Sequence, residues 1–287
     1  MKTLFTLLFS LSVVQSFAHT DPKPVAVTGD TLQVIPASAA YSVTAANGIS
    51  ESIVPYRKNT VKVNLSSLAF NNYSLSYERS FAQKFSAVAG FSMMPETKAT
   101  SIFVVDKAID KWMSEEEDLI NDLSTFNIAN STLTGEVRYY AGKHPGARGF
   151  YVSLYGRYMN TSINYPLEYE SSSENVYTLP FDGKIQGIGG GLMIGAQWLL
   201  YKNFTLDWYI LGAHYGRTTI DLPARTDLST MTETEKQELK QDFESLNEDF
   251  DGRASIKANV TDQGIDVKGN APFAGVRGFG FNIGYTF

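Results

Sequence analysis

Alternation of apolar and polar residues, in segments of about ten residues, is the feature that most constrains how this chain can fold. The last segment ends in GFGFNIGYTF and places an aromatic or aliphatic residue at every second position from Phe279 to Phe287. Successive side chains of a β-strand point to opposite faces, so this pattern predicts a strand with one apolar face. Eight such segments occur, at 60–70, 73–81, 84–94, 132–141, 148–160, 183–200, 204–217 and from Phe273 onward.

The connections between these segments alternate in length. The short ones are 82–83, 142–147 and 201–203, and the long ones are 95–131, 161–182 and 218–272. Outer-membrane barrels have an even number of antiparallel strands, short periplasmic turns and long outer loops. Asn71 and Asn72, the first outer connection, are expected to form a tight hairpin. The sequence therefore predicts an all-β protein, an eight-stranded antiparallel transmembrane up-and-down β-barrel at 59–287.

The start of the chain predicts export. Met1 and Lys2 give a positive start, an apolar run follows, and Ser16-Phe17-Ala18 fits a secretory cleavage pattern, so 1–18 is interpreted as a signal peptide. The apolar run is interrupted and shorter than the roughly 20 residues of a membrane-spanning helix. Four prolines and little periodicity at 19–58 predict a flexible periplasmic leader, with a tail that binds a partner as the alternative. The chain has no cysteine, which excludes a disulfide framework.

Alternation alone does not decide whether the apolar face meets lipid or a protein core. The signal peptide and the aromatic residues near the strand ends favour lipid. The polar face then points into the lumen and carries three cations and three carboxylates, namely Lys62, Glu78, Glu136, Arg138, Arg157 and Asp207. Eight strands leave room only for side chains. We therefore expect a filled, non-conducting lumen with a structural network of ion pairs, an ion path being the alternative. Inward glycines of the sixth and eighth strands, such as Gly195, are expected to make room for Tyr151 and Tyr155.

Four long segments carry a resemblance to a known group of proteins. They read VKVNLSSLAFNNYSLSYERSF, GEVRYYAGKHPGARGFYVSLYGRYMN, IGGGLMIGAQWLLYKNFTLDWYILGAHYG and APFAGVRGFGFNIGYTF. The chain resembles small outer-membrane barrel proteins of the Bacteroidetes, the domain of unknown function 3575 family. The resemblance implies location and architecture but no agreed activity, so it carries over no catalytic residue. It also implies that the barrel-assembly machinery reads the terminal aromatic pattern of Phe281, Ile283, Tyr285 and Phe287.

Two of the long loops are predicted to contain short acidic helices. Ser114 with Glu117, and Thr232 with Glu235, fit capping boxes. In the second helix Leu239, Phe243, Leu246 and Phe250 share one face, which is expected either to pack as a lid on the first helix or the barrel mouth, or to stay exposed for binding. Seven acidic and two basic residues fall in 106–122, and nine acidic and two basic in 227–251. One possible function of these carboxylates is to bind lipopolysaccharide phosphates through shared Mg²⁺ or Ca²⁺ ions. No EF-hand spacing occurs, so no metal site is predicted.

Catalytic signals are weak. The three histidines are His19, His144 and His214, and only His214 lies on a predicted strand, without a serine that could share its face. No nucleotide loop, zinc cluster or basic nucleic-acid surface is present, so neither a cofactor nor nucleic acid is expected.

The predicted function is an integral protein of a Gram-negative outer membrane that is not an enzyme. It is expected to have a structural or recognition role through its outer loops at 95–131 and 218–272. Expected partners are outer-membrane lipid, lipopolysaccharide and an envelope protein. A lipid A-modifying enzyme is the alternative, and a narrow solute channel is the second. The channel needs a wider barrel, for which a hidden hairpin in 161–182 is the candidate, although Tyr165, Leu167 and Tyr169 fit better as an extension of the fifth strand.

Overall fold

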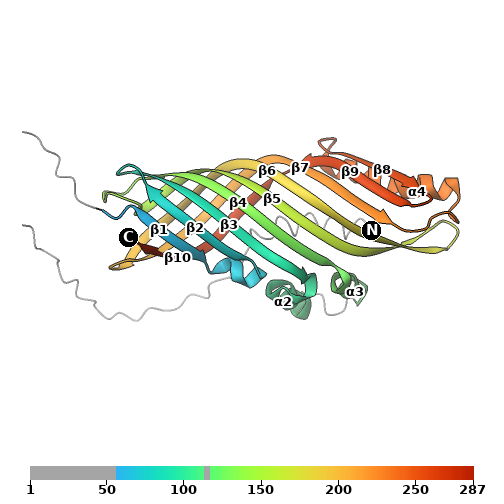
Figure 1. Cartoon of the computed structure of the whole chain (residues 1–287), viewed down its shortest axis with the longest axis horizontal. Coiled ribbons are helices and arrows are strands. Elements are labelled where there is room, and N and C mark those ends of the chain that lie inside the picture. The colour runs from blue at the N-terminus through green and yellow to red at the C-terminus, as the bar shows by residue number, and fades with distance from the viewer. Residues whose placement is uncertain (1–55, 113–116) are drawn as a thin grey trace, which may run out of the picture.

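Eight antiparallel strands form a closed ring in the computed structural model, which describes residues 56–112 and 117–287 (Figure 1). Each strand pairs with the next from β1 to β7, and β10 closes the ring by pairing with both β1 and β7. The ring consists of β1 (Asn59–Asn64), β2 (Tyr73–Ser80), β3 (Phe85–Lys98), β4 (Asn127–Tyr140), β5 (Gly149–Glu170), β6 (Val176–Tyr201), β7 (Phe204–Arg225) and β10 (Gly275–Thr286). The predicted eight-stranded barrel is confirmed.

Part of the sequence analysis falls on residues that the structure does not describe. The predicted signal peptide, the leader up to residue 55 and the first capping box, which needs Ser114, lie outside the described residues. The predicted helical region in 95–131 contains η2 (Ala99–Ser101), α2 (Phe103–Trp112) and α3 (Glu117–Thr125). Within the described ranges, every helix is too short or too polar to cross a membrane.

The first strand is shorter than the sequence predicted. The apolar alternation runs to Phe70, but β1 ends at Asn64 and the next residues form a 3₁₀ helix, η1 (Ser66–Phe70). The Asn64 side chain favours this turn because its Oδ1 accepts a hydrogen bond from the Ser67 N–H at 2.8 Å. Asn71 then adopts φ 53°, a left-handed conformation that asparagine tolerates. The wall of the barrel is therefore low at the β1–β2 connection.

The fourth outer connection contains a hairpin that the sequence analysis missed. β8 (Ser255–Thr261) pairs with β9 (Gly264–Pro272), and β9 pairs with the outer part of β7, from Arg217↔Pro272 to Arg225↔Gly264. The helix predicted within 218–272 is present as α4 (Glu233–Glu244), but the two strands that follow it were not predicted. By contrast, β5 and β6 extend to the pair Glu170↔Val176 as one long hairpin, so the predicted extension is confirmed and no separate hairpin lies in 161–182.

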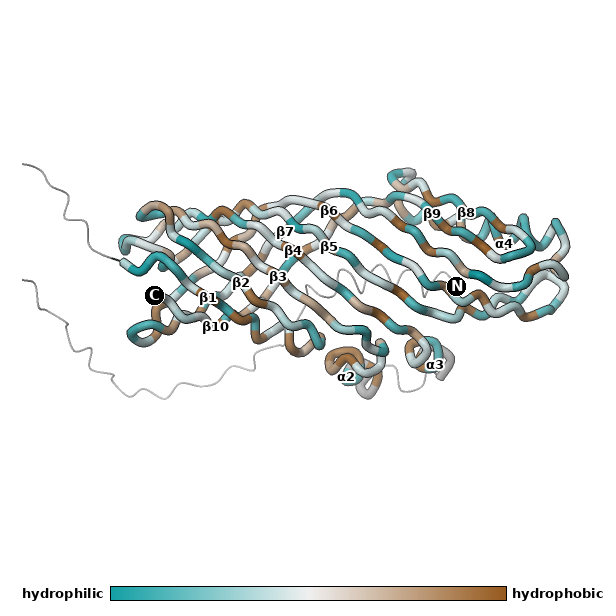
Figure 2. The backbone as a smooth tube through the Cα atoms, in the orientation of Figure 1, coloured by the Kyte–Doolittle hydropathy of each residue, from teal (hydrophilic) through white to brown (hydrophobic). Residues whose placement is uncertain are grey.

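The two faces of β5 exchange polarity part-way along the strand. Apolar and polar residues alternate along the strands in Figure 2. Up to Tyr158 the outward residues are apolar and the inward ones polar or aromatic, as in Val152, Leu154, Tyr151 and Arg157. Farther out the outward residues are polar and the inward ones apolar, as in Asn164, Glu168, Ile163 and Leu167.

The same exchange occurs at one level on the neighbouring strands. In β6 the outward residues change from Ile188, which lies opposite Tyr158, to Gln186. In β7 they change from Tyr215 to Arg217. Exposed apolar side chains therefore form a band around the barrel that ends at this level.

Beyond this level, three strands of the ring continue into a packed structure that we call the outer projection. It consists of the ends of β5, β6 and β7, the β8–β9 hairpin, α4 (Glu233–Glu244) and η3 (Ser245–Phe250) (Figure 1). Leu179, Leu239 and Ile265 are fully buried in its core, and the rings of Phe181 and Phe243 lie 5.5 Å apart. The apolar face predicted for the second acidic helix therefore packs on β6 and the β8–β9 hairpin.

Replacing Phe243 by Ala should loosen the outer projection. The side chain is 1% exposed, and truncating a buried phenylalanine costs about 3–5 kcal/mol. Limited proteolysis should cut F243A within 226–254 at least tenfold faster than the wild type, while gel mobility without boiling still reports a closed barrel. The matched control is T234A on the exposed face of the same helix. Equal cleavage of F243A and T234A would contradict the packing described here.

The N-terminus of α4 should open only in strong acid. The predicted capping box is confirmed, and the Thr232 N–H donates to Glu235 Oε2 at 2.8 Å, which lowers the pKa of Glu235 from 4.5 to about 2. A lowered carboxyl pKa adds stability that is present above about pH 4.5 and is lost as the pH falls through about 2. Pepsin should therefore cut near α4 faster at pH 2 than at pH 4. The E235Q variant lacks the titrating group, and a similar pH dependence in it would refute this assignment.

Candidate functional site in the barrel lumen

Five of the six predicted lumen residues form one chain of ion pairs. Lys62 Nζ lies 2.6 Å from Glu78 Oε2 and 2.5 Å from Asp207 Oδ2. Arg138 joins Asp207 to Glu136, with a nitrogen–oxygen distance of 2.7 Å on each side. All five side chains are buried. The order Glu78–Lys62–Asp207–Arg138–Glu136 places each of the two cations between two carboxylates, so neither cation is buried without a counter-charge.

Aromatic and amide side chains complete this network and fill the lumen around it. The hydroxyls of Tyr140 and Tyr151 donate to Glu78 and Asp207 at 2.7 and 2.9 Å, and Lys62 also donates to Gln197 at 2.7 Å. The guanidinium of Arg138 lies 4.3 Å from the centre of the Tyr151 ring. Gly195 lies against that ring, where a Cβ would overlap it, so this glycine makes the expected room.

Two further arginines lie on the outer side of the network. Arg157 was predicted to belong to it, but it makes no hydrogen bond or ion pair with any residue in the described part of the chain. Arg277 was not predicted, and its Nη1 lies 3.3 Å from Glu136 Oε1. Strict alternation along β10 would point Arg277 outward. Phe279 adopts φ 47°, and this irregularity shifts the alternation so that Arg277 points inward.

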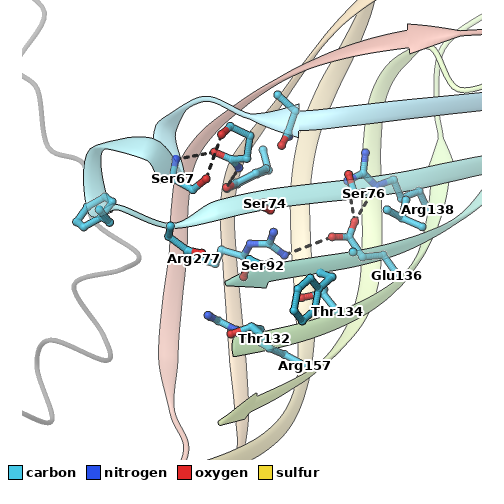
Figure 3. Close-up of a pocket in the computed structure, with 18 residues that line it drawn as sticks. Ser67, Ser74, Ser76, Ser92, Thr132, Thr134, Glu136, Arg138, Arg157 and Arg277 are labelled. Atoms are coloured by element: carbon cyan, nitrogen blue, oxygen red, sulfur yellow. Dashed lines mark hydrogen bonds and ion pairs between the residues drawn. The ribbon is translucent and has the colours of Figure 1, made fainter. Parts of the chain in front are cut away.

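The two arginines line a cavity of about 90 Å³ in the lumen (Figure 3). On its inner side, Glu136 and Arg138 of the ion-pair network form part of its wall. On its outer side, the wall includes Phe70, which belongs to the apolar cluster farther out. The rest of the wall is mostly polar, with hydroxyls from Ser67, Ser74, Ser76, Ser92, Thr132 and Thr134 and amides from Asn64, Asn72 and Asn282. We call this cavity the lumen pocket.

His214 lies close to the lumen pocket but outside its lining. Its Nδ1 is 3.1 Å from the Tyr155 hydroxyl, and its ring centre is 4.7 Å from that of Phe273. No serine, threonine or carboxylate hydrogen-bonds to it within the described ranges, so the geometry does not form a nucleophile–base pair. No group of three residues suited to hold a metal ion occurs among the described residues either.

The four residues predicted as an assembly signal lie on the outer surface of the barrel. Phe281, Ile283, Tyr285 and Phe287 are all exposed, and Tyr285 and Ile283 lie opposite Val61 and Val63 of β1. Their side chains therefore belong to the apolar band, and β10 closes the ring as predicted. A role in assembly stays a prediction.

Comparisons with known proteins add little to this description. No protein-family model and no curated protein matches the chain, so membership of the domain of unknown function 3575 family stays a prediction. Among solved structures, the beta domain of the Bordetella autotransporter Brka aligns with 80% of this chain and 98% of its own length. The identity is 9% and the TM-score is 0.25, so the description of the fold rests on the strand pairing itself.

Replacing Asp207 by Asn should destabilise the barrel strongly. The substitution leaves Lys62 and Arg138 with one counter-charge fewer, and breaking a buried ion pair costs about 3–5 kcal/mol. The urea midpoint of the purified protein in detergent, read from gel mobility without boiling, should fall accordingly. The matched control is D221N, whose carboxylate is 59% exposed and lies 3.6 Å from Lys268, a surface pair worth less than about 1 kcal/mol. Similar midpoints for the two variants would show that the network does not stabilise the fold.

Proposed function

We propose that this chain is an integral β-barrel protein of a Gram-negative outer membrane, with a non-conducting lumen and a recognition role on the outer side. The observation that carries the proposal is the exchange of polarity along β5, β6 and β7. Exposed apolar side chains around a closed barrel suit lipid, and polar ones beyond them suit water. The predicted signal peptide and the short turns at one end of the barrel support the same placement.

The ion-pair network supports a lumen that does not conduct. It crosses the barrel from β1 and β2 through β7 to β4, and the rings of Tyr140 and Tyr151 fill the space around it. Eight-stranded barrels have an interior that side chains fill. Moving Arg138 or Lys62 aside would separate buried charges, at a cost of several kcal/mol.

Recognition is assigned to the outer projection because it is the largest part of the described chain outside the apolar band. Its core is packed, so its surface is held in one shape. That surface carries exposed carboxylates on and next to α4, at Glu233, Asp242, Glu248, Asp249 and Asp251. Such a surface suits a basic protein patch, or lipopolysaccharide phosphates bridged by Mg²⁺ or Ca²⁺.

A planar-bilayer recording tests the closed lumen. Purified wild-type protein should insert without stable stepwise conductance, because the network blocks the lumen. Heat-dependent gel mobility of the same sample serves as the control for a folded barrel. Reproducible conductance steps would replace the proposal with the narrow channel.

The recognition role is tested by neutralising acidic residues of the outer projection. The triple variant E248Q/D249N/D251N should lose proteins cross-linked to the chain on intact cells, or lipopolysaccharide that co-purifies in a Mg²⁺-dependent way. The matched control is E168Q/E170Q, on the outward face of the projecting part of β5. Unchanged partners in the triple variant would exclude this surface. A changed acylation pattern of lipid A in a deletion strain, measured by mass spectrometry, would favour the enzyme instead.

A further inference from the structure

We propose that the lumen pocket binds a small oxyanion of the phosphate class between Arg157 and Arg277. Among the described residues, the lumen contains four cations, Lys62, Arg138, Arg157 and Arg277, and three carboxylates, Glu78, Glu136 and Asp207. The inner network of Lys62, Arg138 and the three carboxylates carries one net negative charge, which Arg277 offsets by pairing with Glu136. The one positive charge left unbalanced is therefore that of Arg157, in the lumen pocket.

The two arginines face the same cavity with few counter-charges. Arg157 has no partner in the described part of the chain, and Arg277 shares Glu136 with Arg138, which holds the other carboxylate oxygen. Tyr209 and Tyr155 hold Arg277 in place, with its guanidinium 4.5 and 5.7 Å from their ring centres. Two guanidiniums that line one cavity repel each other, and an anion between them would remove this repulsion.

The remaining wall of the lumen pocket offers hydrogen bonds suited to a phosphate. The hydroxyls of Ser74, Ser76, Ser92 and Thr134 make no hydrogen bond with other described residues and are free to donate to anion oxygens (Figure 3). Asn72 is 8% exposed, and its side-chain oxygen has no partner among the described residues. That oxygen can accept from the P–OH group of hydrogen phosphate, which sulfate and acetate lack at neutral pH.

Size and access also fit a small ion. One water needs about 10–15 Å³ of such a cavity, so 90 Å³ holds several waters or one oxyanion. The lumen pocket is partly open and not a sealed cavity, so a small ion can reach it. The low wall at the β1–β2 connection, where Ser67, Phe70 and Asn72 line the cavity, lies beside it. A free phosphate ion and the phosphate of a sugar headgroup share this chemistry, and the experiment distinguishes them.

The test is calorimetric titration of the refolded full chain, in an uncharged detergent at constant ionic strength. The probes are inorganic phosphate, glucose 1-phosphate, sulfate and acetate. We expect saturable binding of one inorganic phosphate, with sulfate and acetate at least tenfold weaker. Glucose 1-phosphate binding as tightly as phosphate would identify a headgroup as the ligand source, and its failure to bind would identify the free ion. Phosphate should also raise the urea midpoint, because it binds only the folded barrel.

The main variant is R157Q, because it removes an unpaired cation and should fold at least as well as the wild type in phosphate-free buffer. Its phosphate affinity should fall about tenfold to a hundredfold, since hydrogen bonds to charged groups are the strong ones. The matched control is R217Q, whose arginine lies on the outer face of β7 and bonds Asn270, and it should bind like the wild type. No saturable phosphate binding by the wild type, unchanged affinity in R157Q, or sulfate binding as tight as phosphate would each overturn the proposal.

Discussion

The pairing of β10 with both β1 and β7 is the constraint on which the rest of the structure depends. It closes the ring, so each of the eight strands of the wall has a hydrogen-bonded neighbour on both sides. A closed ring of eight strands is narrow, and its inward charges must then lie close enough to pair. The chain from Glu78 to Glu136 satisfies this requirement inside the barrel. Beyond it, Arg277 pairs with Glu136, but Arg157 has no counter-charge among the described residues, so one positive charge in the lumen pocket is left unbalanced.

Three strands, β5, β6 and β7, each run without a break from the barrel wall into the outer projection. In the barrel their outward face is apolar and their inward face carries mainly polar, aromatic and glycine residues, whereas in the outer projection the inward face is mostly apolar and the outward face mostly polar. The register is continuous across the level of exchange between β5 and β6, so the switch arises from the residue pattern alone. The outer projection is therefore continuous with the barrel wall. The helix α4 and the β8–β9 hairpin pack directly on these continuing strands.

Much of the barrel could be predicted from the sequence because alternation specifies both the strands and their faces. Lys62 and Asp207, far apart in the chain, were expected to share the lumen, and they form an ion pair. Alternation misled where the backbone departs from a regular strand. Asn64 turns the chain into η1, so β1 ends earlier than its alternation predicts. The irregularity at Phe279 shifts the alternation of β10, so counting every second residue wrongly places Arg277 on the outer face. The β8–β9 hairpin was missed because its strands, of 7 and 9 residues, are shorter than the segments of about ten residues that cross a membrane, so their alternation was not read as barrel strands.

The most direct test of the account is to measure which part of β5 contacts lipid. The chain has no cysteine, so single variants L154C and E168C can each carry one environment-sensitive fluorophore. Both side chains point outward on β5, on opposite sides of the polarity exchange. In vesicles, nitroxide-labelled lipid should quench the label at Leu154 strongly and that at Glu168 weakly, and aqueous iodide should do the reverse. Similar quenching at both positions, or stronger lipid quenching at Glu168, would contradict a membrane boundary at this level.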